Sequence, residues 1–199
     1  MKLYGSLTSP YVRKVRLFLA EKGIAYDFVV EGPSDAAGNI ARLNPLGKVP
    51  VLVRDDGEVL FDSPMLIDYL DGIKGMTLIP SSGDARWQAQ RWHALGQGIM
   101  DATVTRLMET RRAGEHQDAG VIKKQEGKIA AALNFAEGQA SGGDWLMGDR
   151  LTVGDIAMAA ALGYMDLRYA HDWRGAHPRL ANWFATFSRR PSFAETAPR

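Results

Sequence analysis

The sequence contains no cysteine among its 199 residues. Disulfide bonds, thiolate metal ligands and redox chemistry that uses the protein's own sulfur are therefore excluded. A strong excess of one charge is also missing, because 24 Lys and Arg residues oppose 23 Asp and Glu residues. Both signs are mixed along the chain, so the charge pattern indicates neither nucleic-acid binding nor an acidic regulatory arm.

Long hydrophobic runs are absent as well. No run reaches the roughly 18 consecutive apolar residues of a membrane-spanning helix. The first five residues reach a polar turn too early for the apolar part of a signal peptide, so we expect a cytoplasmic protein. The four histidines, at positions 93, 116, 171 and 177, have no spacing that suits a metal. We therefore predict neither a metal site nor a permanently bound cofactor.

Short strands and helices alternate in the first 75 residues. Apolar runs between turn signals predict strands at residues 2–5, 26–30, 49–53 and 59–61. Helices are expected from Ser9-Pro10 to Lys22-Gly23, as a short piece within the polar stretch 31–43, and from Ser63-Pro64. In both Ser-Pro pairs the serine suits the N-cap and the proline suits the first helical turn. The order β-α-β-α-β-β-α predicts a thioredoxin-like domain with helices on both faces of a mixed sheet.

The remainder of the chain predicts helices only. Residues 76–83 are expected to form a linker between domains at 1–75 and 84–199. One full helical stripe is formed by Met100, Thr103, Val104, Leu107 and Met108. A second helix follows between residues 122 and 136, and a last one from Pro178 until Pro191 stops it. The predicted fold class is thus an α/β domain followed by an all-α domain.

A capping box marks the start of one helix in the second half. Thr152 is placed to cap the amide three residues later, and Asp155 is placed to reach back to the amide of Thr152. Leu151 and Ile156 occupy the positions of a hydrophobic staple. The following residues 157–162 are apolar on all sides, so this helix is expected to cross the core.

Ser9 is the first candidate for chemistry. The unpaired amides and the dipole at a helix N-terminus favour an anion such as a thiolate. A hydroxyl that donates to sulfur would raise the thiolate fraction of a bound thiol at neutral pH. The alternative is that Ser9 only caps its own helix.

Two further stretches suit the ends of a peptide-like ligand. Proline is confined to the first residue, an edge or a bulge of a strand, so Pro50 leaves the backbone of Val49 free to pair with a ligand. A proline that merely opens an edge strand is the alternative. The hydroxyl and amide of Ser63 suit a carboxylate, and Asp62 suits an ammonium group; capping is the alternative here too.

These motifs resemble those of the glutathione S-transferases in order and spacing. The matching segments are Ser9-Pro-Tyr-Val-Arg-Lys-Val15, Asn44-Pro-Leu-Gly-Lys-Val-Pro50, Asp62-Ser63 and the capping box from Leu151 to Ile156. The sequence is most similar to small bacterial members with Ser-Pro-Phe-Val-Arg-Lys at the first helix. Many bacterial relatives carry cysteine at the position of Ser9, but this chain has none. A mixed-disulfide or thiol-transfer mechanism is therefore not expected here. Tyr4 lies inside the first predicted strand and is expected to pack there.

The resemblance implies a role for each candidate residue. Glutathione would be the cosubstrate, with Ser9 activating its thiol, Val49 and the cis-proline Pro50 binding the cysteinyl backbone, and Lys48 reaching the glycyl carboxylate. Asp62 and Ser63 would bind the γ-glutamyl group. A small hydrophobic electrophile would contact Tyr11, Met100, Thr103, Val104 and Leu107. The family also implies a homodimer, with Arg86, Trp87 and Arg91 as interface candidates because Trp and Arg are enriched in interfaces.

Three functional hypotheses share this site. The first is an enzyme that activates glutathione and transfers its sulfur to an electrophile. The second is a protein of the same fold that binds glutathione or a partner without turnover. The third is a glutathione-dependent isomerase or dehalogenase, which differs only in the pocket for the second substrate. The methionine side chain adapts to ligands of varied shape, so the predicted electrophile pocket does not indicate a particular substrate.

Overall fold

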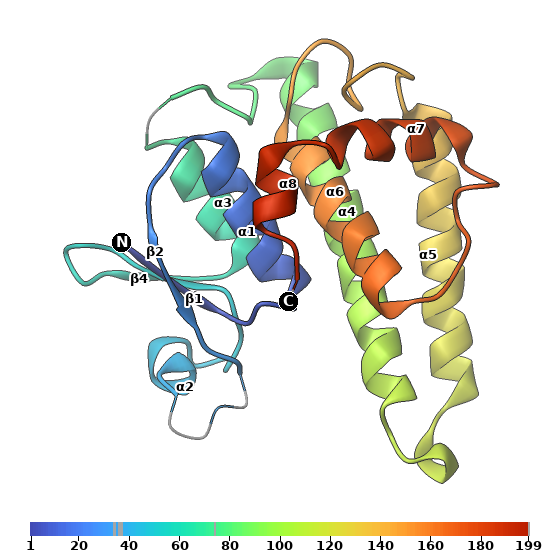
Figure 1. Cartoon of the computed structure of the whole chain (residues 1–199), viewed down its shortest axis with the longest axis horizontal. Coiled ribbons are helices and arrows are strands. Elements are labelled where there is room, and N and C mark those ends of the chain that lie inside the picture. The colour runs from blue at the N-terminus through green and yellow to red at the C-terminus, as the bar shows by residue number, and fades with distance from the viewer. Residues whose placement is uncertain (34, 36–37, 74, 199) are drawn as a thin grey trace. The chain divides into compact units, whose positions relative to one another are not determined.

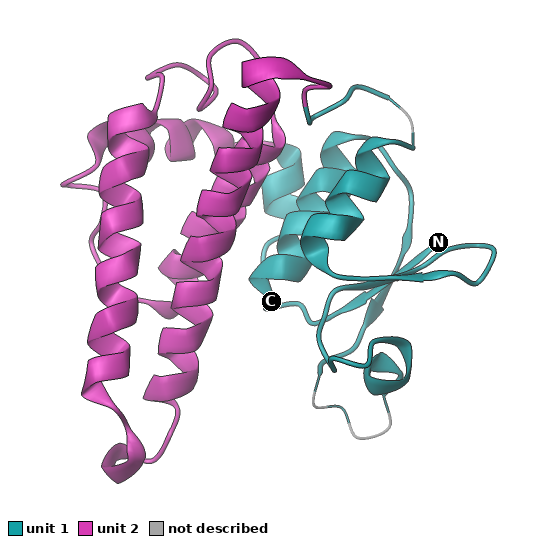
Figure 2. Ribbon diagram, turned by 180° about the vertical axis from the view of Figure 1, so that it is seen from behind, with its two compact units in different colours: residues 1–79, 191–199 teal, residues 80–190 magenta. Residues whose placement is uncertain are grey.

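The computed structural model describes residues 1–33, 35, 38–73 and 75–198. Contacts divide the chain into unit 1, residues 1–79 with 191–199, and unit 2, residues 80–190 (Figure 2). Residues 191–199, which we assigned to the helical domain from the sequence, thus group with the first unit. Over the described ranges, no helix has the length and apolar character needed to cross a membrane.

A four-stranded mixed sheet forms the centre of unit 1. Its strands are β1 (Lys2–Gly5), β2 (Asp27–Val30), β3 (Val51–Val53) and β4 (Val59–Leu60), in the spatial order β2-β1-β3-β4. β1 runs parallel to β2 and antiparallel to β3, and β3 runs antiparallel to β4. In this register Leu3 lies opposite Leu52, and both side chains are fully buried. The predicted order of elements along the chain and the predicted mixed sheet are confirmed.

The strands are shorter than the sequence predicts. β3 begins at Val51 instead of residue 49, which leaves Val49 and Pro50 outside the sheet. A proline has no N–H to contribute to a ladder, so the ladder starts after it. β4 ends at Leu60 and excludes Phe61, while β2 begins at Asp27.

Three helices pack around this sheet. They are α1 (Pro10–Glu21), α2 (Ile40–Leu43) and α3 (Ser63–Asp71). α1 and α3 lie side by side on one side of the sheet and α2 on the other (Figure 1). α2 is the short helix expected within residues 31–43; residues 34, 36 and 37 of that stretch lie outside the described part of the chain.

Buried charged side chains attach the segment that follows α3 to the rest of unit 1. The Asp71 carboxylate accepts hydrogen bonds from the amides of Leu78 at 2.8 Å and Ile79 at 3.2 Å. The fully buried Lys22 ammonium lies 3.3 Å from the same carboxylate. Part of the predicted linker is therefore packed against the end of α3, since Leu78 and Ile79 are buried.

The last helix, α8 (Pro191–Glu195), packs on α1. Pro191 begins this helix, where the sequence predicted only a stop. Arg13 is 5% exposed and donates to the Phe193 carbonyl at 3.0 Å. Its guanidinium carbon lies 3.9 Å from the centre of the Phe193 ring. Burial, with a smaller contribution from Arg16, lowers the pKa of Arg13 to about 10.

Unit 2 is helical. It contains α4 (Gly83–Thr110), a 3-10 helix η1 (Gly114–His116), α5 (Ala119–Gln139), α6 (Val153–Arg168) and α7 (Pro178–Phe187). α6 is buried from Val153 to Met165, as its uniformly apolar sequence predicts. α4 packs on α6 at Gly96, where an added Cβ would lie 2.7 Å from the backbone carbon of Ala157. At the far end of the predicted α4 stripe, Met108 is 53% exposed.

The predicted capping box is present at the start of α6. The fully buried Asp155 carboxylate accepts hydrogen bonds from the Thr152 amide, the Thr152 hydroxyl and the Leu146 amide, at 2.9, 2.9 and 2.8 Å. Burial raises the pKa of this carboxyl although the three donors favour its ionised form. Asp155 thereby joins the helix start to the loop that precedes it.

We expect Asp155→Ala to lower the free energy of unfolding by about 3 kcal/mol or more, because several buried donors lose their acceptor. The exposed Asp144 in the same loop provides the matched control. Asp144→Ala should stay within about 0.5 kcal/mol of the wild type. Urea denaturation measures both variants, and an equal effect of the two substitutions would contradict the anchoring role of Asp155.

Candidate functional site

Ser9 lies in the turn between β1 and α1 and is the N-cap of α1. Its Oγ accepts a hydrogen bond from the Val12 amide at 3.3 Å, so the capping interpretation is confirmed. The hydroxyl proton of Ser9 has no acceptor among the residues that the structure describes. A serine hydroxyl can accept and donate at once, so capping leaves the donor function open, and that function stays a prediction.

Asn44 shapes the loop that leads to Val49. Its side chain is buried, donates to the Lys48 carbonyl at 2.8 Å and accepts from the Leu46 amide at 3.0 Å. Gly47, with φ +61°, donates its amide to the Asn44 carbonyl at 2.8 Å. We did not assign this role from the sequence, although Asn followed by Pro and Gly is a turn signal.

The Val49–Pro50 peptide bond is cis, as the resemblance implies. Pro50 is buried, Val49 is partly exposed and Lys48 is exposed. Neither the N–H nor the C=O of Val49 makes a hydrogen bond within the described part of the chain. An unpaired, accessible backbone segment next to a strand is suited to pair with an extended ligand.

Asp62 and Ser63 lie at the start of α3. The N-cap is Asp62, so the prediction that Ser63 caps the helix is wrong by one residue. The Asp62 side chain is exposed and makes no capping hydrogen bond. The Ser63 hydroxyl and the amides of Ser63 and Met65 have no partner among the described residues. The fold itself therefore uses neither the donors that a carboxylate would bind nor the Asp62 carboxylate that an ammonium ion would bind.

The strand register brings these groups to one end of the sheet. Tyr4, near the end of β1, lies opposite Val51 at the start of β3. Leu60, at the end of β4, lies opposite Leu52. The segments with Ser9, Val49 and Asp62 therefore leave the sheet at the same end of three neighbouring strands. Unit 1 thus gathers a thiol-activating candidate, a free backbone segment and a charged helix start.

The residues predicted to contact an electrophile fall in both units. Tyr11 is a partly exposed residue of α1. On α4, Met100 and Thr103 are buried, and the Thr103 hydroxyl donates to the Ile99 carbonyl at 2.8 Å. Val104 and Leu107 are partly exposed. The grouping of these residues around one substrate stays a prediction.

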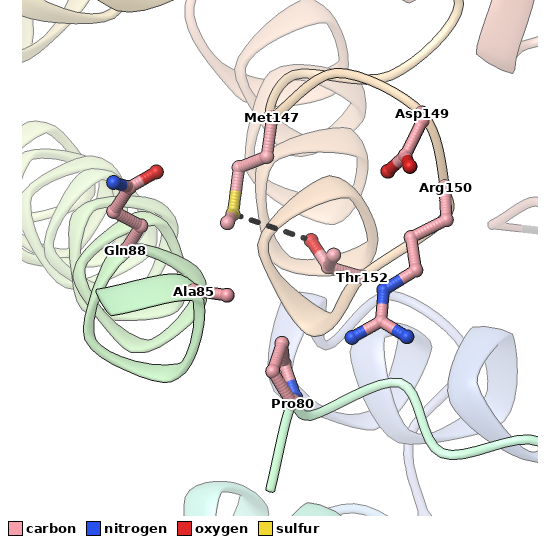
Figure 3. A pocket seen from close by; sticks show the side chains of 7 residues that line it. All are labelled: Pro80, Ala85, Gln88, Met147, Asp149, Arg150 and Thr152. Atoms are coloured by element: carbon pink, nitrogen blue, oxygen red, sulfur yellow. Dashed lines mark hydrogen bonds between the residues drawn. The ribbon is translucent and has the colours of Figure 1, made fainter. Parts of the chain in front are cut away.

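The buried His177 has structural partners within unit 2. Nδ1 of His177 lies 2.6 Å from the Trp173 carbonyl oxygen and Nε2 lies 3.0 Å from Oδ1 of Asn134. The described residues contain no group of three or more His, Asp or Glu side chains that could hold a metal ion. A small hollow in unit 2 contains none of the predicted site residues (Figure 3). It is lined by Pro80, Ala85, Gln88, Met147, Asp149, Arg150 and Thr152.

Comparison with known proteins places the chain in a family. Residues 3–77 match the family model of the glutathione S-transferase N-terminal domain, and residues 91–186 match that of the C-terminal domain. The chain is also 38% identical to an uncharacterized GST-like protein of Escherichia coli K12, YibF, over 100% of this chain and 98% of the relative. The chain belongs to the glutathione S-transferase family. Its fold is the thioredoxin-like domain followed by an all-helical domain that the sequence predicts.

Solved glutathione S-transferases have the same fold as this chain. One from Methylobacillus flagellatus KT, with GSH bound, is 41% identical with a TM-score of 0.96, covering 100% of this chain and 99% of that one. A family member from Pseudomonas fluorescens Pf-5, with bound S-(propanoic acid)-glutathione, is 38% identical with a TM-score of 0.88 and full coverage of both chains.

Proposed function

We propose that this protein binds glutathione in unit 1 and conjugates the glutathione sulfur to a small electrophile. The observation that carries the proposal is the convergence of Ser9, Val49 and Asp62 at one end of strands β1, β3 and β4. Glutathione presents a thiol, a peptide backbone and an α-amino acid in one molecule, which are the three groups that these segments suit. The related structure with GSH bound supports this choice of ligand.

Each end of glutathione has a binding partner in the proposal. The N–H and C=O of Val49 pair with the cysteinyl backbone as an added strand would. Asp62 binds the γ-glutamyl ammonium group, while the hydroxyl and amide of Ser63 bind its carboxylate. Lys48, which is exposed on the loop before Val49, reaches the glycyl carboxylate. Glutathione is a cosubstrate and leaves as part of the product.

Ser9 activates the thiol in this mechanism. Its hydroxyl donates a hydrogen bond to the sulfur, and the N-terminal end of α1 adds a favourable field for negative charge. Both effects lower the pKa of the bound thiol, which releases its proton to solvent. The thiolate then forms a carbon–sulfur bond with the electrophile, and the leaving group departs with the electrons of the broken bond.

A binding protein without turnover is the second candidate. One observation favours it: the Ser9 hydroxyl already serves as the cap of α1 through its bond to the Val12 amide. If capping is its only role, the thiol has no side-chain donor and turnover is slow. The two candidates share the glutathione site and differ in the donor function of Ser9.

We further propose that the protein is a homodimer. The side chain of Trp87 on α4 is 70% exposed, and that of Phe135 on α5 is 43% exposed. Arg91 joins these helices, because it donates to Oε1 of Gln139 at 3.2 Å and its guanidinium carbon lies 5.5 Å from the centre of the Phe135 ring. Aromatic and arginine residues are typical of interface centres, whereas Arg86 donates to the Pro80 carbonyl within its own unit.

The first prediction of the proposed function concerns the γ-glutamyl end of the ligand. We expect Asp62→Ala to weaken glutathione binding more than tenfold, because a lost charge-assisted hydrogen bond costs about 1.5–3 kcal/mol. Asp68→Ala, which removes another exposed carboxylate of α3, should leave the affinity unchanged. Calorimetric titration measures both, and absence of glutathione binding to the wild type at millimolar concentration would refute the proposed function.

The second prediction separates an enzyme from a binding protein. We expect Ser9→Ala to lower the conjugation rate about a hundredfold at neutral pH, because a donor to an anionic sulfur is lost. The rate should partly recover at high pH, where glutathione ionises without help, and Ser9→Thr should remain active because it keeps the hydroxyl. The cap loss costs about 1 kcal/mol of stability, so the unfolding midpoint is measured alongside. Superimposable pH–rate profiles of wild type and Ser9→Ala would leave Ser9 as a cap only.

The third prediction concerns assembly. Light scattering at micromolar concentration should show twice the 21.8 kDa mass of one chain. We expect Trp87→Glu to shift the protein towards the monomer, because a charge would be buried in the interface. The comparable substitution Leu167→Glu, at an exposed apolar residue of α6, should leave the mass unchanged. A monomeric wild type would refute the proposed dimer.

A further inference from the structure

The loop that carries Val49 is held in its conformation by one residue. Residues 44–50 lie between α2 and β3 and belong to neither element. Every hydrogen bond that the described residues make within this loop involves Asn44. The Gly47 amide donates to its carbonyl at 2.8 Å, the Leu46 amide donates to its Oδ1 at 3.0 Å, and its Nδ2 donates to the Lys48 carbonyl at 2.8 Å. The path of the chain towards β3 therefore depends on Asn44.

The side-chain amide of Asn44 has only one orientation that satisfies its neighbours. The residue is 1% exposed, so its polar atoms need partners within the protein. A backbone carbonyl only accepts a hydrogen bond and a backbone amide only donates one, so Nδ2 must face Lys48 and Oδ1 must face Leu46. An ionised aspartate would still form the turn at Leu46. It would have no hydrogen to donate to the Lys48 carbonyl, so the turn alone does not explain asparagine at this position.

Asn44 is itself connected to the sheet through α2. Its backbone amide donates to the Ile40 carbonyl at 2.8 Å, at the C-terminal end of α2. The Ile40 amide donates to the buried Glu31 carboxylate at 2.7 Å. Glu31 follows β2 directly, and its backbone amide donates to the carbonyl of Gly5, the last residue of β1, at 3.1 Å. A series of hydrogen bonds thus connects β1 with Asn44 and fixes where its side chain begins.

The hydrogen bond from Asn44 also fixes the direction of the Val49 N–H. The Lys48 carbonyl and the Val49 N–H belong to the same peptide group, which is trans and planar. In such a group the C=O and the N–H point in opposite directions. Because Nδ2 of Asn44 holds the carbonyl on one side, the N–H is directed to the other side, where it has no partner among the described residues. A hydrogen bond to the carbonyl also polarises the peptide group and strengthens its N–H as a donor.

We propose that Asn44 is a positioning residue and, resting on the proposed function, that it directs the Val49 N–H at the cysteinyl carbonyl of glutathione. Asn44 acts on the ligand only through the peptide group between Lys48 and Val49, since its own side-chain bonds stay within the loop. Its role differs from that of Ser9, which acts on the thiol, and from that of Asp62, which binds the γ-glutamyl end. Loss of Asn44 therefore weakens binding and leaves the reactivity of the bound thiolate unchanged.

The experiment compares two ligands that differ only in one carboxamide, γ-glutamylcysteine amide and γ-glutamylcysteamine. The first has the cysteinyl carbonyl and the second lacks it, while both keep the thiol and the γ-glutamyl group. Calorimetric titration of the wild type should show about tenfold tighter binding of γ-glutamylcysteine amide, because one hydrogen bond is added. In Asn44→Ala this preference should disappear, because the affinity for the amide falls while that for γ-glutamylcysteamine stays unchanged.

Conjugation kinetics with a chlorinated aromatic electrophile separate positioning from catalysis. In Asn44→Ala the KM for glutathione should rise about tenfold, again for the loss of one hydrogen bond. The kcat at saturating glutathione and the pH–rate profile should match those of the wild type, because Ser9 is intact. An unchanged KM together with a lower kcat would overturn the positioning role.

Two further variants complete the design. Asn134→Ala is the matched control, because it removes an asparagine that bonds to Nε2 of His177 in unit 2, and it should keep the wild-type preference. Asn44→Asp is used if Asn44→Ala fails to fold. It keeps the acceptor for the Leu46 amide, lacks the donor to the Lys48 carbonyl, and should lose the preference for γ-glutamylcysteine amide as well.

The outcomes distinguish this proposal from the proposed function. If the wild type binds glutathione but binds the two analogues equally, the positioning role is overturned and glutathione binding stands. A folded Asn44→Ala or Asn44→Asp with the wild-type preference would also overturn it. The same holds for an equal loss of both analogues, or for loss of the preference in Asn134→Ala, since either would show a general disturbance of the fold. If the wild type does not bind glutathione at all, the proposed function fails and the positioning role fails with it.

Discussion

The antiparallel pairing of β3 with both β1 and β4 is the constraint on which the candidate site depends. Because β3 begins opposite Tyr4 and β4 ends opposite Leu52, three loops emerge together at one end of the sheet. A slip of one residue in this register would turn the buried Leu52 towards the opposite face. The burial of Leu3 and Leu52 in the core therefore also determines which polar groups can meet a single ligand.

Buried charged groups tie neighbouring segments together in this protein. Asp71 and Asp155 each accept hydrogen bonds from amides of an adjacent loop, so they hold irregular segments against helices. Their hydrogen bonds offset the free energy of taking a carboxylate out of water. Arg13 is buried as well, and it donates to the Phe193 carbonyl, which ties α1 to α8.

Ser9 shows why capping and catalysis are not exclusive explanations. The side-chain oxygen accepts a hydrogen bond from the Val12 amide and stabilises the start of α1. The hydroxyl proton has no acceptor among the described residues. The cap also limits the freedom of the hydroxyl, since its oxygen is held at the helix end. One bond can thus stabilise the fold and pre-position a donor for a bound thiolate.

The sequence by itself determined the elements and their order. Alternating apolar runs, Ser-Pro helix starts and the capping box are local signals, so β1, α1, α6 and the order of the elements along the chain could be predicted from neighbouring residues alone. The candidate ligand-binding segments with Ser9, Val49 and Asp62 were named from local motifs and from the family resemblance, and their role in binding stays a prediction. Tertiary structure decided what local pattern does not contain: the start of β3 at Val51, the Asp62 cap of α3, the burial of Arg13 under Phe193 and the return of residues 191–199 to the first unit. The last two depend on contacts between residues far apart in the sequence, because α8 meets α1 only in the folded chain.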